Sequence, residues 1–204
     1  MKRIIILASG SGSNAENIIT YFREHQQIEV SAVLTNKNTA QVIERCKRLK
    51  VPALYFNKAA FSSSKVVLDF LCSQKPDLIV LAGFLWKIPK ELVIAFPNKI
   101  VNIHPALLPK YGGKGMYGNK VHEAVKENKE TETGITIHFV NEHYDKGAII
   151  HQAKTTILAK DTAEQIAEKV HVLEYEHFPK ILEKLLSSPD IAIAVARSKG
   201  GVKQ

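Results

Sequence analysis

Residues 3–14 read "RIIILASGSGSN", an apolar β-branched run that ends in a glycine-rich turn. A second run, "DLIVLAGF" at residues 77–84, has the same near-continuous apolar character. Strands of this kind suit a parallel sheet with both faces covered, because neither side of the strand meets water. Helical patterns alternate with these runs through the first half of the chain. We therefore expect an α/β fold with a mostly parallel central sheet and helices on both faces.

The second half of the chain has a different pattern. The segments "GITIHFV" (134–140) and "AIIHQAKTTI" (148–157) alternate between apolar and polar residues, and the loop "NEHYDKG" joins them, which predicts antiparallel strands. A long amphipathic helix is expected from about residue 162 to 186, with Asp161 as its cap. These patterns predict one domain over residues 1–187 with an antiparallel C-terminal extension, followed by a basic, partly flexible tail over residues 188–204.

Composition sets the broad class of protein. The chain of 204 residues has a net charge of +8, which favours anionic partners, but its 28 lysines and arginines are dispersed, and this weakens a nucleic-acid interpretation. The first residues resemble neither a signal peptide nor a membrane span, so we expect a cytoplasmic protein without membrane contact. Cys46 and Cys72 are too few for a disulfide framework, and we expect both thiols to be buried.

The glycine turn after the first strand is a candidate anion site. Backbone N–H groups and the positive end of the helix dipole meet at such a turn. The turn formally matches the dinucleotide fingerprint G-x-G-x-x-G/A, but Asn36 stands where a nicotinamide site needs an acidic residue. A small monophosphate fits better, because Gly12 allows close approach while Ser13 and Asn14 add polar donors. A glycine turn without any ligand is the simpler alternative.

The segment "IVNIH" (100–104) is a second candidate site. Asn102 and His104 are two residues apart on a strand, so their side chains point to the same side at the strand's end. An asparagine can donate to a developing oxyanion, and a histidine can move a proton near neutral pH. Asp145, in the loop between the antiparallel strands, is our candidate for orienting the histidine. A buried histidine bonded to backbone beside an ordinary asparagine is the alternative.

Four motifs, in their order along the chain, resemble those of a known family. The segments "GSGSN", "VLAGFLWKIP", "NIHPALLPKY" and "HFVNEHYDKGAIIHQ" resemble the phosphoribosylglycinamide formyltransferases, which are folate-dependent enzymes of purine biosynthesis. The resemblance implies a Rossmann-like formyltransferase fold. It also implies transfer of a formyl group from 10-formyltetrahydrofolate to the amine of phosphoribosylglycinamide, with no metal.

The resemblance also assigns roles to residues. Asn102 and His104 match the catalytic pair, and Asp145 matches the aspartate that raises the pKa of the histidine. Gly12, Ser13 and Asn14 match the phosphate-binding turn. Glu174 matches the glutamate that holds the amine or ribose end of the substrate. Besides Asn102, the positions that match the folate-binding segments are Leu85, Trp86, Lys87, Ile88, Asn141, Glu142, His143 and Tyr144.

Some positions depart from the family's pattern, and some questions stay open. Trp86 stands where an arginine is often found, either Ser64 or Lys65 occupies another folate position, and the Gly/Lys loop 110–118 is longer than usual. Methionyl-tRNA formyltransferase and formyltetrahydrofolate hydrolase share part of the motif set and are the alternative enzymes. A non-catalytic nucleotide-binding module is the alternative of another class. We expect small-molecule substrates and a monomer or homodimer.

Overall fold

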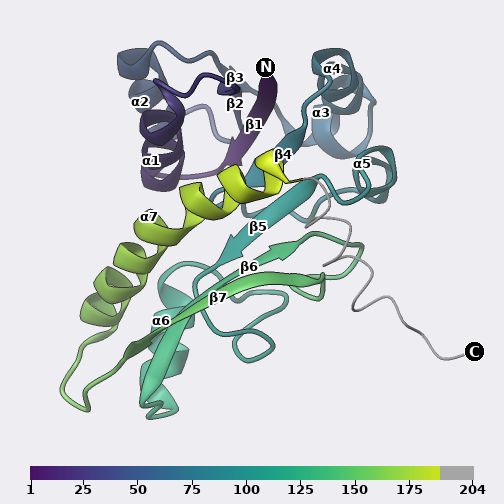
Figure 1. Ribbon diagram of the computed structural model, residues 1–204. Helices are drawn as coiled ribbons and strands as arrows, with labels where there is room; N and C mark the ends of the chain where they lie inside the picture. The colour runs from purple at the N-terminus through teal and green to yellow at the C-terminus, as the bar shows by residue number, and fades with distance from the viewer. Residues whose placement is uncertain (189–204) are drawn as a thin grey trace, which may run out of the picture. The chain divides into compact units, whose positions relative to one another are not determined.

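The computed structural model describes residues 1–188 of the chain. Seven strands form one sheet in the order β3-β2-β1-β4-β5-β6-β7 (Figure 1). The chain divides into two compact units, the first from Met1 to Val101 and the second beginning at Asn102. The α/β class and the mostly parallel sheet with antiparallel C-terminal strands are confirmed. Apart from Ser188, the predicted tail lies outside the described residues.

The elements follow the alternating order that the sequence predicts. The first unit contains β1 (Lys2–Ala8), α1 (Ser13–Phe22), β2 (Ile28–Thr35), α2 (Val42–Leu49), β3 (Ala53–Tyr55), α3 (Lys58–Ser62), α4 (Val66–Gln74), β4 (Leu78–Leu81) and α5 (Lys90–Ala95). Strand β5 (Ile100–His104) begins at the boundary, and the second unit continues with α6 (Asn119–Glu127), β6 (Glu132–Phe139), β7 (Ile149–Thr156) and α7 (Ala163–Ser187).

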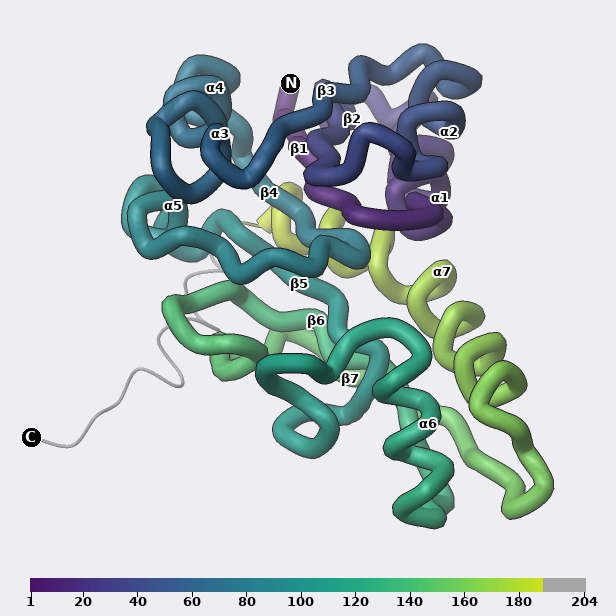
Figure 2. Tube along the Cα trace, turned by 180° about the vertical axis from the view of Figure 1, so that it is seen from behind, coloured from purple at the N-terminus to yellow at the C-terminus, as the bar shows by residue number. Residues whose placement is uncertain are grey.

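Strand β1 forms the centre of the first unit. It pairs in parallel with β2 and with β4, and β2 pairs in parallel with β3. Helices α1 and α2 lie on one side of β1 and helices α3, α4 and α5 on the other (Figures 1 and 2). The side chains from Ile4 to Ala8 are at most 1% exposed as a result. The uninterrupted apolar run is therefore explained by the helices on both faces of the strand.

In the second unit, β6 and β7 pair antiparallel, and helix α7 packs on both strands and on α6. Helix α7 begins with a capping box in which the Thr162 side chain accepts from Gln165 N. The prediction of Asp161 as the cap is wrong, because its carboxylate accepts from Leu158 N and pairs with Lys169 instead. No helix within residues 1–188 combines the length and apolar character needed to cross a membrane.

Two further features of the first unit differ from expectation. Helix α3 was not predicted, because its five residues are too short for a helical period to be visible; the Asn57 side chain caps it by accepting from Ala60 N at 2.9 Å. Cys46 is buried as expected, and burial raises the pKa of its thiol to about 11. Cys72 is exposed, so the expectation that it is buried is wrong.

The pairing of β6 with β7 depends on Gly134. A Cβ atom at this position would lie 1.9 Å from the Ala153 carbonyl oxygen, which is backbone of β7 and cannot swing away. We expect Gly134→Ala to lower the free energy of unfolding by about 1–3 kcal/mol, measured by urea denaturation. Gly10→Ala is the matched control, because nothing lies within 4 Å of the added Cβ. Equal stability of the two variants would contradict this account of the β6–β7 pairing.

Candidate active site

The end of β5 carries the first two polar side chains of the site. The alternation along the strand puts Asn102 and His104 on one side, as the sequence predicts. His104 is only 4% exposed, and Asn102 is half-buried. Two polar side chains thus leave the end of the strand close together, and both need partners inside the protein.

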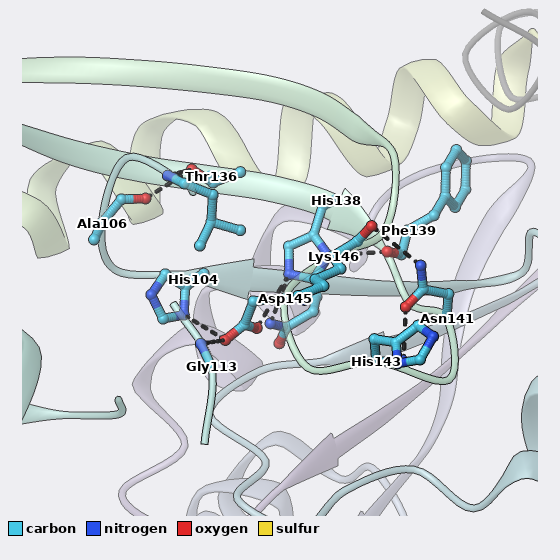
Figure 3. A network of polar contacts seen from close by, with 12 residues as sticks. His104, Ala106, Gly113, Thr136, His138, Phe139, Asn141, His143, Asp145 and Lys146 are labelled. Carbon is cyan, nitrogen blue, oxygen red and sulfur yellow. Dashed lines mark hydrogen bonds and ion pairs between the residues drawn. The ribbon is translucent and has the colours of Figure 1, made fainter. Parts of the chain in front are cut away.

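The chain after β5 is held by a buried hydroxyl of β6. Thr136 Oγ1 donates to the Ala106 carbonyl at 2.7 Å and accepts from Leu108 N at 3.0 Å. Gln152 of β7 donates to the Leu108 carbonyl at 3.0 Å. Figure 3 shows the Thr136–Ala106 contact beside the site. These bonds fix the segment that leaves His104, so the imidazole has a defined position relative to β6.

Asp145 lies between two buried histidines. Its Oδ2 is 3.7 Å from His104 Nδ1, and its Oδ1 is 3.6 Å from Nε2 of His138 on β6. The same carboxylate accepts a hydrogen bond from Gly113 N at 2.8 Å. Figure 3 shows the carboxylate between His104 and Gly113 on one side and His138 on the other. The structure thus brings the three predicted catalytic residues together within the second unit.

A tight turn aims the Asp145 side chain inward. Asp145 has φ +52°, in the left-handed region that a non-glycine residue rarely adopts. Two residues later, a Cβ at Gly147 would lie 1.6 Å from the Phe139 carbonyl oxygen, so the turn packs backbone against backbone at the end of β6. This close approach explains the glycine of the "DKG" segment.

The contacts of His104 define where its proton lies. Its Nε2 is 2.7 Å from the Tyr111 carbonyl oxygen, which can only accept, so Nε2 carries the hydrogen and Nδ1 faces Asp145. Burial lowers the pKa of His104 more than the Asp145 carboxylate and the Tyr111 carbonyl raise it, and the net pKa lies below the ordinary value. Asp145 does raise the pKa of the histidine. His104 is nevertheless neutral near pH 7, because burial outweighs the aspartate.

Asp145 itself is held ionised. Burial raises the pKa of its carboxyl group, but the neighbouring His138, the hydrogen bond from Gly113 N–H and the neighbouring His104 together lower it by more, so the net pKa is below the ordinary value. At neutral pH the site therefore holds a carboxylate beside a neutral His104 imidazole. This pair is well placed to accept a proton, since the carboxylate would stabilise the resulting imidazolium.

His138 is a site residue that our sequence reasoning missed. It is 2% exposed, and its Nδ1 donates to the Phe139 carbonyl at 2.9 Å. Its Nε2 can then accept from Asn102 Nδ2, which lies 3.1 Å away. That bond orients the Asn102 amide and leaves its second N–H for a ligand. Thr136 and His138 are two residues apart on one strand, as Asn102 and His104 are. This repeated spacing of polar residues could have identified His138 from the sequence.

The carbonyl that holds His104 is itself anchored. Tyr111 has φ +55°, and its hydroxyl donates to Glu130 at 2.8 Å. Its ring packs against an apolar cluster of α6, α7 and the segment after β7, and Lys110 donates to the same carboxylate at 3.0 Å. This arrangement fixes the Tyr111 backbone, and with it the hydrogen-bond acceptor for His104.

Glu174 is a second buried carboxylate of this unit. It lies on α7, is 5% exposed, and accepts from His171 Nδ1 at 2.9 Å. This hydrogen bond raises the pKa of His171. Glu174 also interacts electrostatically with His104. The predicted substrate glutamate is therefore a neighbour of the Asp145 cluster.

In the first unit, the predicted phosphate turn has the geometry of an anion site. Gly12 has φ +75°, and a Cβ there would lie 2.3 Å from Val42 Cγ2, so only glycine fits. No side chain caps α1, which leaves N–H groups of its first turn for an anion beside Ser13 and Asn14. Arg45 donates to the Ser11 carbonyl at 2.7 Å and holds the turn from α2.

The predicted folate segment of residues 85–88 lies beside the end of β1. Leu85 N donates to the hydroxyl of Ser9, a 1% exposed residue that sequence reasoning missed. Trp86 packs in an aromatic cluster with Phe56, Phe61 and Phe84. Ile88 is 6% exposed, while Leu85 and Lys87 are exposed. The side chain of Ile88 therefore faces the core, and a ligand here would meet the backbone, Leu85 or Lys87.

The loop of residues 141–144 is organised by its own asparagine. Asn141 Oδ1 accepts from His143 N at 2.9 Å, and Asn141 Nδ2 donates to the Lys146 carbonyl at 3.1 Å (Figure 3). Glu142, His143 and Tyr144 are exposed at the tip of this turn. Within residues 1–188, no group of three or more His, Cys, Asp or Glu side chains is arranged to hold a metal ion.

Comparisons with known proteins identify the family of the chain. A family model described as formyl transferase matches residues 2–182. The chloroplastic phosphoribosylglycinamide formyltransferase of Arabidopsis thaliana is 43% identical over 183 residues, which cover 86% of this chain and 62% of that protein. The phosphoribosylglycinamide formyltransferase of Bacillus subtilis (strain 168) is 37% identical over 193 residues, covering 91% and 95%. The chain thus spans about three fifths of the plant relative and nearly all of the bacterial one.

Solved structures lead to the same family. The crystal structure of phosphoribosylglycinamide formyltransferase from Bacillus halodurans superposes with a TM-score of 0.82 at 36% identity, covering 92% of this chain and 97% of that one. Glycinamide ribonucleotide transformylase 1 from Geobacillus kaustophilus also gives a TM-score of 0.82 at 36% identity, with 91% and 99% covered. With the family model matching most of its length, the chain belongs to the formyl transferase family.

Proposed function

We propose that the protein transfers the formyl group of 10-formyltetrahydrofolate to the amine of phosphoribosylglycinamide, a step of purine biosynthesis. The printed names of its relatives support this reaction. The observation that carries the proposal is the cluster around Asp145, whose carboxylate lies 3.7 Å from His104 and 3.6 Å from His138, while the Asn102 amide lies 3.1 Å from His138. Such a set suits addition of an amine to a carbonyl group.

In the first step the amine attacks the formyl carbon directly, and a new C–N bond forms. The carbonyl oxygen becomes an oxyanion, which accepts a hydrogen bond from the free N–H of the Asn102 amide. His138 holds that amide in the required orientation. Stabilisation of this kind costs no reorganisation at the moment of reaction, since the donor is already in place.

In the second step the attacking nitrogen loses a proton and the folate nitrogen gains one. Neutral His104 accepts the proton at Nδ1, and Asp145 stabilises the imidazolium that results. The proton then passes to the folate nitrogen as its bond to the formyl carbon breaks. The Tyr111 carbonyl keeps the imidazole oriented throughout, because Nε2 remains its donor.

The remaining predicted residues bind the two substrates. The turn of Gly12, Ser13 and Asn14 takes the phosphate, and Glu174 takes the amine or ribose end of phosphoribosylglycinamide. The segments 85–88 and 141–144, together with Asn102, take the folate, and a contact from Ser64 or Lys65 remains a prediction. A cytoplasmic location, assembly as a monomer or homodimer, and a role of loop 110–118 over bound substrate are also predictions from the sequence.

The identity of the formyl acceptor distinguishes this reaction from those of the alternative enzymes. We expect purified protein with 10-formyltetrahydrofolate to formylate phosphoribosylglycinamide. Methionyl-tRNA and water should be poor acceptors by comparison. Formate release that does not depend on phosphoribosylglycinamide would identify a hydrolase instead, and formylation of methionyl-tRNA would identify the tRNA enzyme. Ligand binding without transfer to any acceptor would identify a non-catalytic module.

Asn102 is the residue whose loss should affect the transition state most selectively. We expect Asn102→Ala to lower kcat by about a hundredfold while KM for both substrates changes little, because the oxyanion exists only after attack. Asn128→Ala is the control, since that exposed side chain donates only to the Ala124 carbonyl of its own helix. A rise in KM with unchanged kcat would instead make Asn102 a ground-state binding residue.

The pH dependence of the reaction should follow the lowered pKa of His104. His104 must be neutral to accept a proton, so kcat/KM should fall on the acid side only below about pH 6.5. Because Asp145 raises the pKa of His104, Asp145→Asn should move this acid limb to lower pH while also lowering kcat. Any titration of the substrate amine affects wild type and Asp145→Asn equally when both are given the same substrates. The difference between their pH profiles therefore reports the enzyme. An acid limb that moves to higher pH in the variant would contradict this assignment.

A further inference from the structure

His122 is a buried imidazole that the mechanism above does not use. It lies on α6, where Val121, His122 and Val125 form the buried face, and it is 3% exposed. Its Nδ1 is buried and has no hydrogen-bond partner. An unpaired buried nitrogen costs free energy that an apolar side chain would not, so packing alone does not explain a histidine here.

The surroundings of His122 belong to the polar centre of the second unit. His122 interacts electrostatically with His171 and Glu174 on α7 and with His104 at the end of β5. Helix α6 packs against α7, which brings these groups together. Glu174 in turn acts on both His104 and His122. His122 is therefore linked electrostatically to the proposed reaction centre and to the proposed substrate glutamate.

The charges of this cluster indicate which ligand it suits. Burial lowers the pKa of His122, and His171 and His104 lower it further, while Glu174 raises it; the net pKa is below the ordinary value. Near pH 7 a neutral ring thus lies close to a buried carboxylate, and this pair suits a ligand with several N–H or O–H donors. Phosphoribosylglycinamide has such donors in its glycinamide arm and its ribose hydroxyls.

We propose that His122 is a further binding residue for the acceptor substrate, with Nδ1 making a hydrogen bond to an N–H or O–H group of phosphoribosylglycinamide beside Glu174. The inference rests on the proposed function. His122 therefore sets affinity for the acceptor and takes no part in proton transfer. It explains why α6 carries one polar residue on its buried face.

Three variants test the role of His122. His122→Leu removes the nitrogen and keeps an apolar side chain, and His122→Asn restores a polar atom near the position of Nδ1. Val121→Ala is the matched control, because it loosens the buried face of α6 next to His122 without removing a polar group. For each protein, KM for phosphoribosylglycinamide, KM for 10-formyltetrahydrofolate, kcat and the urea unfolding midpoint are measured. Calorimetric titration with phosphoribosylglycinamide alone gives its affinity independently of turnover.

We expect His122→Leu to raise KM and Kd for phosphoribosylglycinamide about tenfold, with an unchanged folate KM and an unfolding midpoint at least as high as that of the wild type. His122→Asn should recover most of the lost affinity. Unchanged acceptor affinity in His122→Leu would overturn the inference, and so would an equal loss in Val121→Ala or an equal rise in both KM values. Wild-type protein that neither binds nor formylates phosphoribosylglycinamide would refute the proposed function itself, which is a separate outcome.

Discussion

The negative charge of Asp145, whose side chain is 12% exposed, is the constraint on which the polar centre of the second unit depends. A carboxylate is costly to remove from water unless it gains close partners. Here it gains a hydrogen bond from the Gly113 N–H at 2.8 Å, and His104 and His138 lie 3.6–3.7 Å away, where they can become its ion-pair partners on protonation. The left-handed conformation of Asp145 and the close approach of Gly147 to β6 are local costs of aiming this charge inward. Strands β5 and β6 each supply one of the histidines.

The same burial that makes the carboxylate useful also decides the charge of His104. An aspartate beside a histidine favours the imidazolium, but here desolvation of the ring has the larger effect and keeps His104 neutral near pH 7. A neutral imidazole beside an ionised carboxylate can take up a proton during reaction. The Tyr111 carbonyl, held through Glu130 and the apolar cluster, fixes which nitrogen is free to do so. The same contacts thus position His104, fix its tautomer and decide which of its nitrogens can accept a proton.

Local patterns predicted much of this structure. The period of two on β5 predicted that Asn102 and His104 share a side, and the uninterrupted apolar run at Ile4–Leu7 predicted a strand covered on both faces. The convergence of Asp145 on His104 came from chemistry together with resemblance, because 41 positions separate them in the sequence. Local spacing carries no information about such distant pairs.

What the sequence did not predict depends on tertiary contacts. The roles of His138 and Ser9 follow from neighbours 36 and 76 positions away. Helix α3 is too short to show a period, and exposure of Cys72 depends on which face of α4 meets the core. The net pKa of His104 could not be predicted for a related reason. Spacing can identify a neighbouring charge, but the extent of burial that opposes it appears only when the chain is folded.

The most direct test of this account is the protonation of His104 itself. Nitrogen-15 NMR of the imidazole rings, with His104→Gln to assign the resonances, reports both the tautomer and the pKa. We predict a neutral ring with its hydrogen on Nε2 at pH 7.5, and a pKa below 6.5. A pKa above 6.5, or a hydrogen on Nδ1 in the neutral ring, would contradict the claim that burial outweighs Asp145 and leaves Nδ1 free to accept a proton.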